Sequence, residues 1–153
     1  MKEICFDILS DTILKDADAI CFTSNGIVKA SGELTMGAGV AKQFKEKFGA
    51  VIARNAGTLV KRNGNICQAV GIHYSGIKKI NIVAFPTKYH WKNPSDLGLI
   101  KKSAKELMAL VDKLGWTKVY LPRLGTGMGN LQWAVVKAEL EKILDDRITI
   151  TYL

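Results

Sequence analysis

The stretch Leu121-Pro122-Arg123-Leu124-Gly125-Thr126-Gly127-Met128-Gly129-Asn130 joins an apolar strand pattern to a helical pattern in this 153-residue chain. Glycines alternate at its positions 125, 127 and 129. A loop of this kind can turn successive backbone N–H groups into a concave nest for a diphosphate. Its spacing is not that of a dinucleotide-binding fingerprint, and the Gly-Lys-Ser/Thr ending of a P-loop is absent. A plain connection would need fewer glycines, so we expect this loop to bind a ligand.

Strand and helix patterns alternate on both sides of this loop. Strands are expected at residues 4–9, 19–23, 68–74, 79–85, 118–121 and 148–153, and helices at 38–48, 97–114 and 133–144. Gly115 is placed to cap the second helix, and a turn is expected at Ser75-Gly76. This order predicts an α/β fold with a mostly parallel or mixed sheet. Ligands then gather beyond the carboxyl ends of the strands.

A second glycine-rich loop follows the strand at residues 19–23. It begins at Asn25-Gly26 and runs to Met36-Gly37-Ala38-Gly39-Val40, where a helix starts. A helix start offers unpaired N–H groups and a positive dipole end, which suit a phosphate. Glycines at this place are equally typical of tight helix packing, and both interpretations stay open.

The third informative loop is Phe85-Pro86-Thr87-Lys88-Tyr89-His90-Trp91, which follows a buried strand. Its aromatic side chains could stack on a base or enclose a sugar, and Lys88 could act as a nucleophile or stabilise charge. An exposed lysine beside packing aromatics is the alternative. We interpret His73 and His90 as structural, and two histidines without clustered thiols argue against a metal site.

Composition narrows the class of protein. The net charge is +8 and the isoelectric point about 9.4, which favours anionic partners. The lysines are spread along the chain, so charge alone does not indicate DNA binding. Cys5, Cys21 and Cys67 lie in apolar stretches and are expected to be buried free thiols. Acidic residues near the N-terminus argue against a signal peptide, and no apolar run could span a bilayer, so we expect a cytoplasmic protein.

Together, these segments resemble the macro domain family over nearly the whole chain. The likeness is strongest to the subgroup of the terminal ADP-ribose glycohydrolase and the antitoxin that removes ADP-ribose from thymidine in DNA. It rests on residues 36–44, 85–91 and 124–133. The resemblance implies a single domain over 1–153, with a three-layer α/β/α fold around a mixed, mostly parallel sheet. It also implies that the ligand is ADP-ribose or an ADP-ribosylated macromolecule, nucleic acid included, and that no cofactor is needed.

The resemblance further implies roles for individual residues. Lys88 matches the lysine on which this subgroup depends for hydrolysis, and Asn25 matches the asparagine near the distal ribose. Asp11, with Thr12 beside it, matches the aspartate that receives the adenine amino group. The remaining expected ligand-binding residues are Gly37, Ala38, Gly39, Val40, Phe85, Thr87, Gly125, Thr126, Gly127, Met128 and Gly129.

Two departures from the family pattern bear on the chemistry. Phe22 stands where many macro domains have the first asparagine of an Asn-x-x-Asn pair. Gly129 stands where the protein-directed glycohydrolase has an acidic partner for its lysine, whereas the DNA-directed relatives have glycine. We therefore expect an ADP-ribosyl glycohydrolase, a hydrolase that acts on DNA thymidine rather than on protein carboxylates. A non-catalytic ADP-ribose-binding module, an ADP-ribose 1″-phosphate phosphatase and a nucleic-acid-binding surface are the alternatives.

Overall fold

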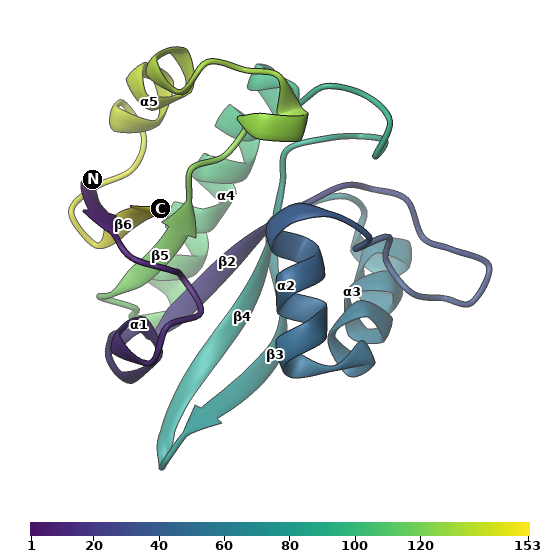
Figure 1. The fold of residues 1–153 in the computed structure, drawn as a ribbon, viewed down its shortest axis with the longest axis horizontal. Coiled ribbons are helices and arrows are strands. Elements are labelled where there is room, and N and C mark those ends of the chain that lie inside the picture. Colours follow the sequence, from purple (N-terminus) through teal and green to yellow (C-terminus); the bar gives the residue numbers. More distant parts are fainter.

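A computed structural model describes residues 1–153, apart from the side chain of Met128 (Figure 1). The strands are β1 (Lys2–Cys5), β2 (Ala19–Ser24), β3 (Gln68–Ser75), β4 (Lys78–Pro86), β5 (Val119–Pro122) and β6 (Ile148–Tyr152). The helices are α1 (Asp11–Asp16), α2 (Gly39–Phe48), α3 (Ala50–Asn63), α4 (Leu97–Leu114) and α5 (Trp133–Glu141), with a short 3₁₀ turn η1 (Gly127–Gly129).

The six strands form one sheet in the order β1-β6-β5-β2-β4-β3. Only the β3–β4 pair is antiparallel, and the other neighbours run parallel. The expectation of a mixed, mostly parallel sheet is confirmed. In Figure 1 the β3–β4 hairpin extends beyond the helices at the edge of the sheet.

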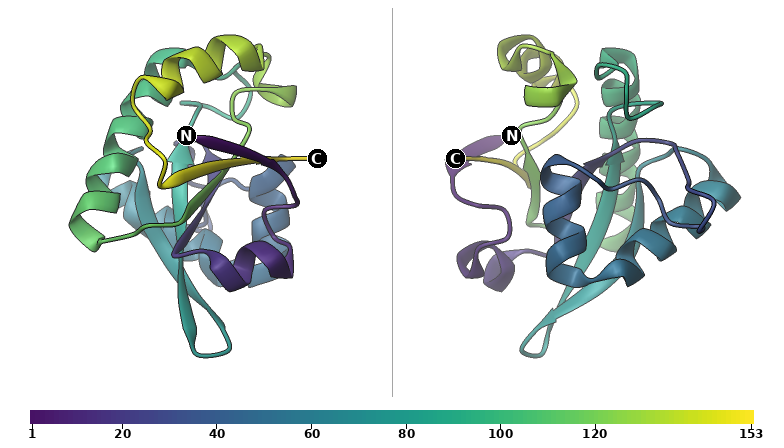
Figure 2. Two further views of the ribbon diagram at one scale, coloured as in Figure 1. Left: turned by 90° about the vertical axis from the view of Figure 1, so that its left-hand side faces the viewer. Right: turned by 45° about the vertical axis from the view of Figure 1, so that its right-hand side comes forward.

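The central strand β2 shows why helices cover both faces of the sheet. Ile20 and Phe22 pack into a core with residues of α1, α2 and α3, whereas Ala19 and Cys21 pack into a second core with α4 and α5. This alternation follows from the two-residue period of a strand buried on both faces. The left view of Figure 2 shows the sheet between these two layers, so the three-layer prediction is confirmed.

The N-terminal segment differs from the prediction. The strand expected at residues 4–9 ends at Cys5, because the chain turns there and the N–H of Ser10 donates to the carbonyl of Asp7 at 3.0 Å. The Ser10 hydroxyl then accepts from the N–H of Ile13 and caps α1. Neither α1 nor α3 was predicted. The six residues of α1 are too few to show a helical period.

The long helix α4 begins and ends as the sequence predicts. The Asp96 side chain accepts from the N–H of Leu99 at 2.8 Å, and Gly115 adopts a left-handed conformation with φ of 70°. The N–H of Gly115 donates to the carbonyl of Val111, which satisfies one of the last helical carbonyls. The last helix, α5, stops at Glu141, three residues before the predicted end at 144.

The cysteines are all free thiols, but one prediction about them is wrong. Cys21 and Cys67 are buried, and burial raises the pKa of both thiols above its ordinary value. Cys5 is exposed, because β1 is an edge strand whose last residue lies outside both cores. No helix in the described part of the chain is long and apolar enough to cross a bilayer.

Candidate functional site

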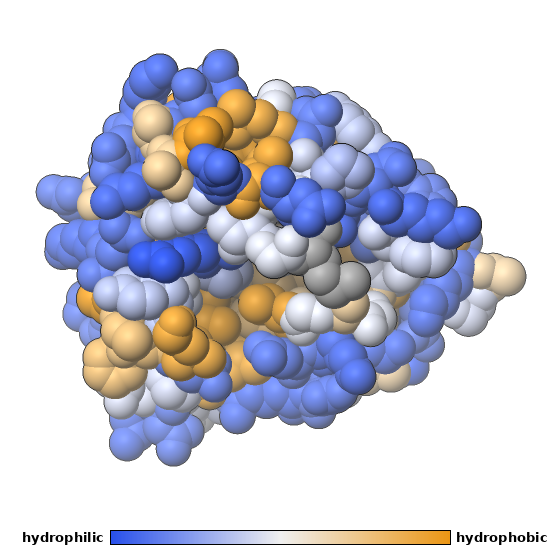
Figure 3. All heavy atoms as spheres, turned by 45° about the horizontal axis from the view of Figure 1, so that its top comes forward, coloured by the Kyte–Doolittle hydropathy of each residue, from blue (hydrophilic) through white to orange (hydrophobic). Residues whose placement is uncertain are grey.

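A cleft of about 700 Å³ lies at the carboxyl ends of the adjacent strands β2, β4 and β5. Ser24 ends β2 and lines the cleft. The segment from β2 to the start of α2 supplies about half of the walls, and the loops after β4 and β5 supply the other half. This is the edge at which ligands gather in open α/β sheets. Figure 3 views the molecule from this side and shows apolar atoms exposed between hydrophilic side chains.

Most residues predicted for the site meet in this cleft. They are Asn25, Gly37, Ala38, Gly39, Val40, Thr87, Lys88, Gly125, Thr126, Gly127 and Gly129. Three predicted residues do not line it. Asp11 and Thr12 are exposed on the first turn of α1, and Phe85 is fully buried in the core between the sheet and α4. The Met128 side chain lies outside the described part of the structure.

The N-terminus of α2 opens into the cleft without a side-chain cap. Its N-cap residue is Ala38, which has no side chain that could accept a hydrogen bond, and the first turn contains no acidic residue. Gly39 adopts a φ of 59°, a conformation that favours glycine. The first N–H groups of this helix are therefore open to an anion, and the helix dipole adds attraction.

The glycine-rich loop after β5 needs its glycines for two reasons. Gly125 and Gly127 adopt φ values of 77° and 59°. A Cβ atom at position 125 would also lie 3.0 Å from the Leu131 side chain and 3.2 Å from that of Ile100. The N–H of Leu131 donates to the carbonyl of Gly125 at 2.7 Å and closes the loop. The loop is thus packed on the core and presents its backbone to the cleft.

Lys88 is half-buried on the cleft wall, and its backbone is held from two sides. Its N–H donates to the carbonyl of Ser24 at 3.3 Å, and its own carbonyl accepts from the Asn65 side chain at 3.1 Å. Its Nζ lies 3.5 Å from the carbonyl oxygen of Trp91. Asn65 was not predicted, because nothing in the sequence connects the end of α3 with a residue 23 positions later. It positions Lys88 without lining the cleft.

Asn25 lines the cleft and organises the loop that follows it. Its Oδ1 accepts from the N–H of Ile27 at 3.0 Å, and its Nδ2 donates to the carbonyl of Thr35 at 3.1 Å. The two ends of the segment between β2 and α2 are therefore tied together at the cleft. This arrangement keeps the wall that contains Gly37 and Gly39 in place.

Several lining residues were not predicted: Thr23, Ser24, Thr35, Met36, Ala41, Trp91, Ser95 and Arg123. Trp91 and Arg123 lie in the loops at 85–91 and 121–130, which were expected to bind the ligand, so the sequence could have indicated that they line the cleft. Nothing in the sequence indicated Ser95, because it lies in the connection to α4 outside the three loops expected to bind the ligand. Phe22, the departure from the Asn-x-x-Asn pair, is fully buried, and its ring lies 5.4 Å from that of Phe44 on α2.

The charges around the cleft favour an anion. Lys88 and Arg123 line it, and none of the described residues that line it is acidic. Arg123 stacks on Tyr152 at 4.0 Å, and its guanidinium lies 3.7 Å from the Glu3 carboxylate. A hydrogen bond from Lys137 holds the pKa of Glu3 below its usual value, and Arg123 adds to this effect. In the described part of the chain, no group of three His, Cys, Asp or Glu side chains could hold a metal ion.

Trp91 lines the cleft near Lys88, and Tyr89 is the neighbour of Lys88 in the chain. Tyr89 and Trp91 are large and only partly covered, with exposed fractions of 60% and 48%. The ring of Trp91 packs against His90 at 5.4 Å, and Lys92 lies over it at 5.2 Å. His90 Nδ1 accepts from the N–H of Lys92 and so fixes this turn. The rim therefore combines a flat apolar surface with a cation.

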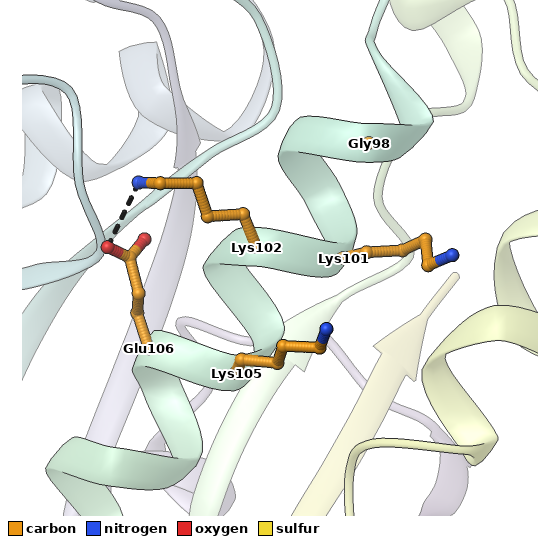
Figure 4. A pocket seen from close by; sticks show the side chains of 5 residues that line it. All are labelled: Gly98, Lys101, Lys102, Lys105 and Glu106. Atoms are coloured by element: carbon orange, nitrogen blue, oxygen red, sulfur yellow. Dashed lines mark hydrogen bonds and ion pairs between the residues drawn. The ribbon is translucent and has the colours of Figure 1, made fainter.

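A second hollow, of about 420 Å³, lies on the outer face of α4 (Figure 4). Gly98, Lys101, Lys102, Lys105 and Glu106 line it, all from one helix. Lys102 pairs with Glu106 at 3.1 Å, and Lys101 pairs with Glu139 at 3.5 Å. Lysines on one solvated helix face, without loops that enclose a ligand, make this hollow the weaker candidate.

Comparison with known proteins agrees with this geometry. The family model of the Macro domain matches residues 29–139. A DNA ADP-ribosyl glycohydrolase of Thermus aquaticus is 31% identical over 72% of this chain and 31% of its own length, so the chain spans about a third of that relative. The ADP-ribose glycohydrolase OARD1 of Bos taurus is 32% identical over 78% of this chain and 76% of its own length. The macrodomain of Mycobacterium tuberculosis DarG superposes with a TM-score of 0.78 at 26% identity, covering 99% of this chain and 97% of that one.

Proposed function

Since this chain belongs to the macro domain family, we propose that it is an ADP-ribosyl glycohydrolase whose cleft binds ADP-ribose. One observation carries the proposal: two sets of backbone N–H donors line a single cleft that contains cations and no described carboxylate. The uncapped N-terminus of α2 supplies the first set, and the loop at Gly125–Gly129 supplies the second. A diphosphate needs donors of this kind.

Lys88 is the proposed catalytic residue. It acts at the anomeric carbon of the distal ribose, either by attack or by stabilising the charge that develops there. Its backbone is fixed by Ser24 and Asn65, so the amine approaches a bound ribose from a defined wall. Asn25 orients the ribose, and binding of the remote adenosine positions the reacting carbon.

We propose that the adenosine half of the bound ADP-ribose extends towards α1. Asp11 and Thr12 are exposed at the start of that helix and lie outside the walls of the cleft. Their proposed contact with adenine therefore requires the ligand to reach beyond the hollow. Phe85 supports the strand end below Thr87 from within the core.

DNA is the proposed macromolecular substrate, in preference to protein carboxylates. Gly129 brings no carboxylate to the cleft. Tyr89 and Trp91 offer exposed rings beside Lys88, and base–aromatic stacking is typical of single-strand binding. Lys92 adds a positive charge at the same rim. The Thermus aquaticus relative, a DNA ADP-ribosyl glycohydrolase, supports the choice of DNA, whereas the ADP-ribose glycohydrolase OARD1 supports the hydrolase activity alone.

The test is a panel of three conjugates: an oligonucleotide ADP-ribosylated on thymidine, a glutamate-linked ADP-ribosyl peptide, and ADP-ribose 1″-phosphate. We expect release of ADP-ribose from the oligonucleotide, with slower or no release from the other two. Faster release from the peptide would overturn the choice of DNA. Absence of release from all three would overturn the enzymatic assignment.

A non-catalytic reader of ADP-ribose is the second candidate, and one observation favours it. The Nζ atom of Lys88 lies within hydrogen-bonding distance of the Trp91 carbonyl, which could hold it away from a bound ribose. Tight binding of ADP-ribose by calorimetry, together with no release from the panel, would support this candidate.

A further inference from the structure

Ser95 lines the cleft and takes no part in the proposed action of Lys88 and Asn25. It lies in the connection from β4 to α4, is only 7% exposed, and lines the cleft. Its N–H donates to the carbonyl of Gly129 at 2.9 Å, and the N–H of Asp96 donates to the carbonyl of Thr87 at 2.9 Å. Ser95 therefore sits where the glycine-rich loop meets the segment that carries Lys88.

The Ser95 hydroxyl occupies the space that a side chain at position 129 would need. A Cβ atom on Gly129 would lie 2.4 Å from Ser95 Oγ and 3.2 Å from Ser95 Cβ. Ser95 Cβ is held by a backbone that is tied to the same loop, so a side chain at position 129 would force the Ser95 hydroxyl to rotate out of its present position. The Ser95 hydroxyl in its present position and a side chain at position 129 therefore exclude each other.

This hydroxyl is also available for a ligand. Among the described residues, Ser95 Oγ has no hydrogen-bond partner within the protein. Ser103, on the first half of α4, shows the contrast, because its hydroxyl donates to the carbonyl of Pro86 at 2.7 Å. A nearly buried hydroxyl that lines a cleft and lacks a partner is a donor ready for substrate.

We propose that Ser95 is a specificity-determining residue, whose hydroxyl donates a hydrogen bond to the nucleobase as it leaves the ADP-ribose. This role rests on the proposed glycohydrolase function. In the reaction the bond between the anomeric carbon and the base breaks, and its electron pair goes to the base. Water adds its oxygen to the anomeric carbon, and a proton from that water ends on the base.

The chemistry explains why a hydroxyl suits this leaving group. The departing base carries negative charge spread over a ring nitrogen and its carbonyl oxygens, and a hydroxyl can donate to such an oxygen. A carboxylate at this place would repel the charge. A carboxylate leaving group, by contrast, is stable as an anion and needs little help, so a site built around Ser95 favours base-linked over carboxylate-linked ADP-ribose.

The experiment compares Ser95→Ala with the unaltered protein on two substrates. One is the thymidine-linked oligonucleotide, and the other is 4-nitrophenyl ADP-ribose, whose phenolate leaves readily without a donor. We expect kcat on the oligonucleotide to fall by about 100- to 1000-fold, as for other lost donors to developing charge. Turnover of the nitrophenyl substrate and the Kd for ADP-ribose should stay within about twofold, because the donor acts on the leaving group alone.

A second pair of variants tests whether the Ser95 hydroxyl occupies the space that a side chain at position 129 would need. Gly129→Ala alone should lower the melting temperature, whereas Ser95→Gly combined with Gly129→Ala should restore it but leave turnover of the oligonucleotide low. Equal losses on both substrates for Ser95→Ala, or no loss on either, would overturn the role of Ser95 while the glycohydrolase function stands. If the unaltered protein releases ADP-ribose from neither substrate, the proposed function fails, and the role of Ser95 fails with it.

Discussion

Substitution of Gly125 by alanine tests whether the glycine-rich loop is a packed structure rather than a flexible connection. Gly125 has a φ of 77°, which costs an L-residue about 1–2 kcal/mol. The added Cβ would also lie 3.0 Å from Leu131, 3.2 Å from Ile100 and 3.3 Å from Val136. These contacts are with side-chain ends that can shift, so we add about 1 kcal/mol, the low end of the range for overpacking. The expected loss is about 2–3 kcal/mol in the free energy of unfolding.

Two other glycines serve as controls that separate the cost of backbone strain, the cost of overpacking and the loss of ligand binding. Gly115, the C-cap residue of α4, has a left-handed φ of 70°, close to that of Gly125, and a Cβ there meets nothing within 4 Å. Gly115→Ala should therefore show the cost of the left-handed backbone alone. Gly37 has no such constraint and also faces open space, but it lines the cleft. Gly37→Ala should leave stability unchanged and weaken ADP-ribose binding, because the methyl group enters space that the ligand needs.

The assay is thermal unfolding by circular dichroism, paired with calorimetry of ADP-ribose binding. For a domain of this size 1 kcal/mol corresponds to about 2–4 °C. Gly125→Ala should therefore melt about 4–12 °C lower, and Gly115→Ala about 2–8 °C lower. Only the variants at Gly125 and Gly37 should lose affinity. If Gly125→Ala melts no lower than Gly115→Ala and binds normally, the loop is not packed as described.

Three further predictions follow from the site and its surroundings. Trp91→Ala should weaken binding of an ADP-ribosylated oligonucleotide by about 5- to 100-fold, which is the contribution of one stacked base. The same variant should bind free ADP-ribose almost normally, and Trp91→Phe should bind the oligonucleotide almost normally, because a ring remains for stacking. Asn65→Ala should lower kcat by about tenfold with ADP-ribose binding almost unchanged, because the Lys88 carbonyl loses its donor and the loop loosens. The pKa of Asp16 is lowered by hydrogen bonds from Lys118 and then Tyr120. The ionised Asp16 carboxylate therefore stabilises the fold above the pKa of the unfolded chain, about 3.9, and this stabilisation is lost as the pH falls through the lower pKa of the folded state. Asp16→Asn should therefore make the melting temperature fall less steeply as the pH is lowered in the acid range.

The sequence was sufficient for the sheet and for most of the cleft because strong local signals coincided there. Buried strands such as β2 show continuous apolar runs, and α4 has a long apolar stripe with Gly115 after it. The glycine-rich loops and Lys88 follow strands that end at the same edge of a parallel sheet. Their meeting in one cleft follows from the topology.

Helix α3 shows where such reasoning fails. Its buried residues include Ala53, Ala56 and Gly57, which are small because the loop after β2 lies directly on the helix. A Cβ atom at Gly57 would lie 1.9 Å from the carbonyl oxygen of Gly32, and the N–H of Leu34 donates to the carbonyl of Ala53. Small residues give a weak hydrophobic pattern, so close packing against a loop conceals the helix in the sequence.

Asn65 and Ser95 were missed for a related reason. Each acts on a residue distant in the chain: Asn65 through the carbonyl of Lys88, and Ser95 through the space beside Gly129. Such contacts exist only once the elements pack. The sequence does show that Gly129 lacks a side chain, but not that Ser95 fills the space beside it.

Lys88→Ala tests the central claim most directly, with the thymidine-linked oligonucleotide as substrate and calorimetry of free ADP-ribose as the control. The backbone contacts of residue 88 with Ser24 and Asn65 do not depend on its side chain, so the walls of the cleft should persist. We predict that release of ADP-ribose is abolished while the Kd for ADP-ribose stays within about threefold, as expected for a group that acts mainly in the transition state. Undiminished release by this variant would contradict the catalytic role of Lys88.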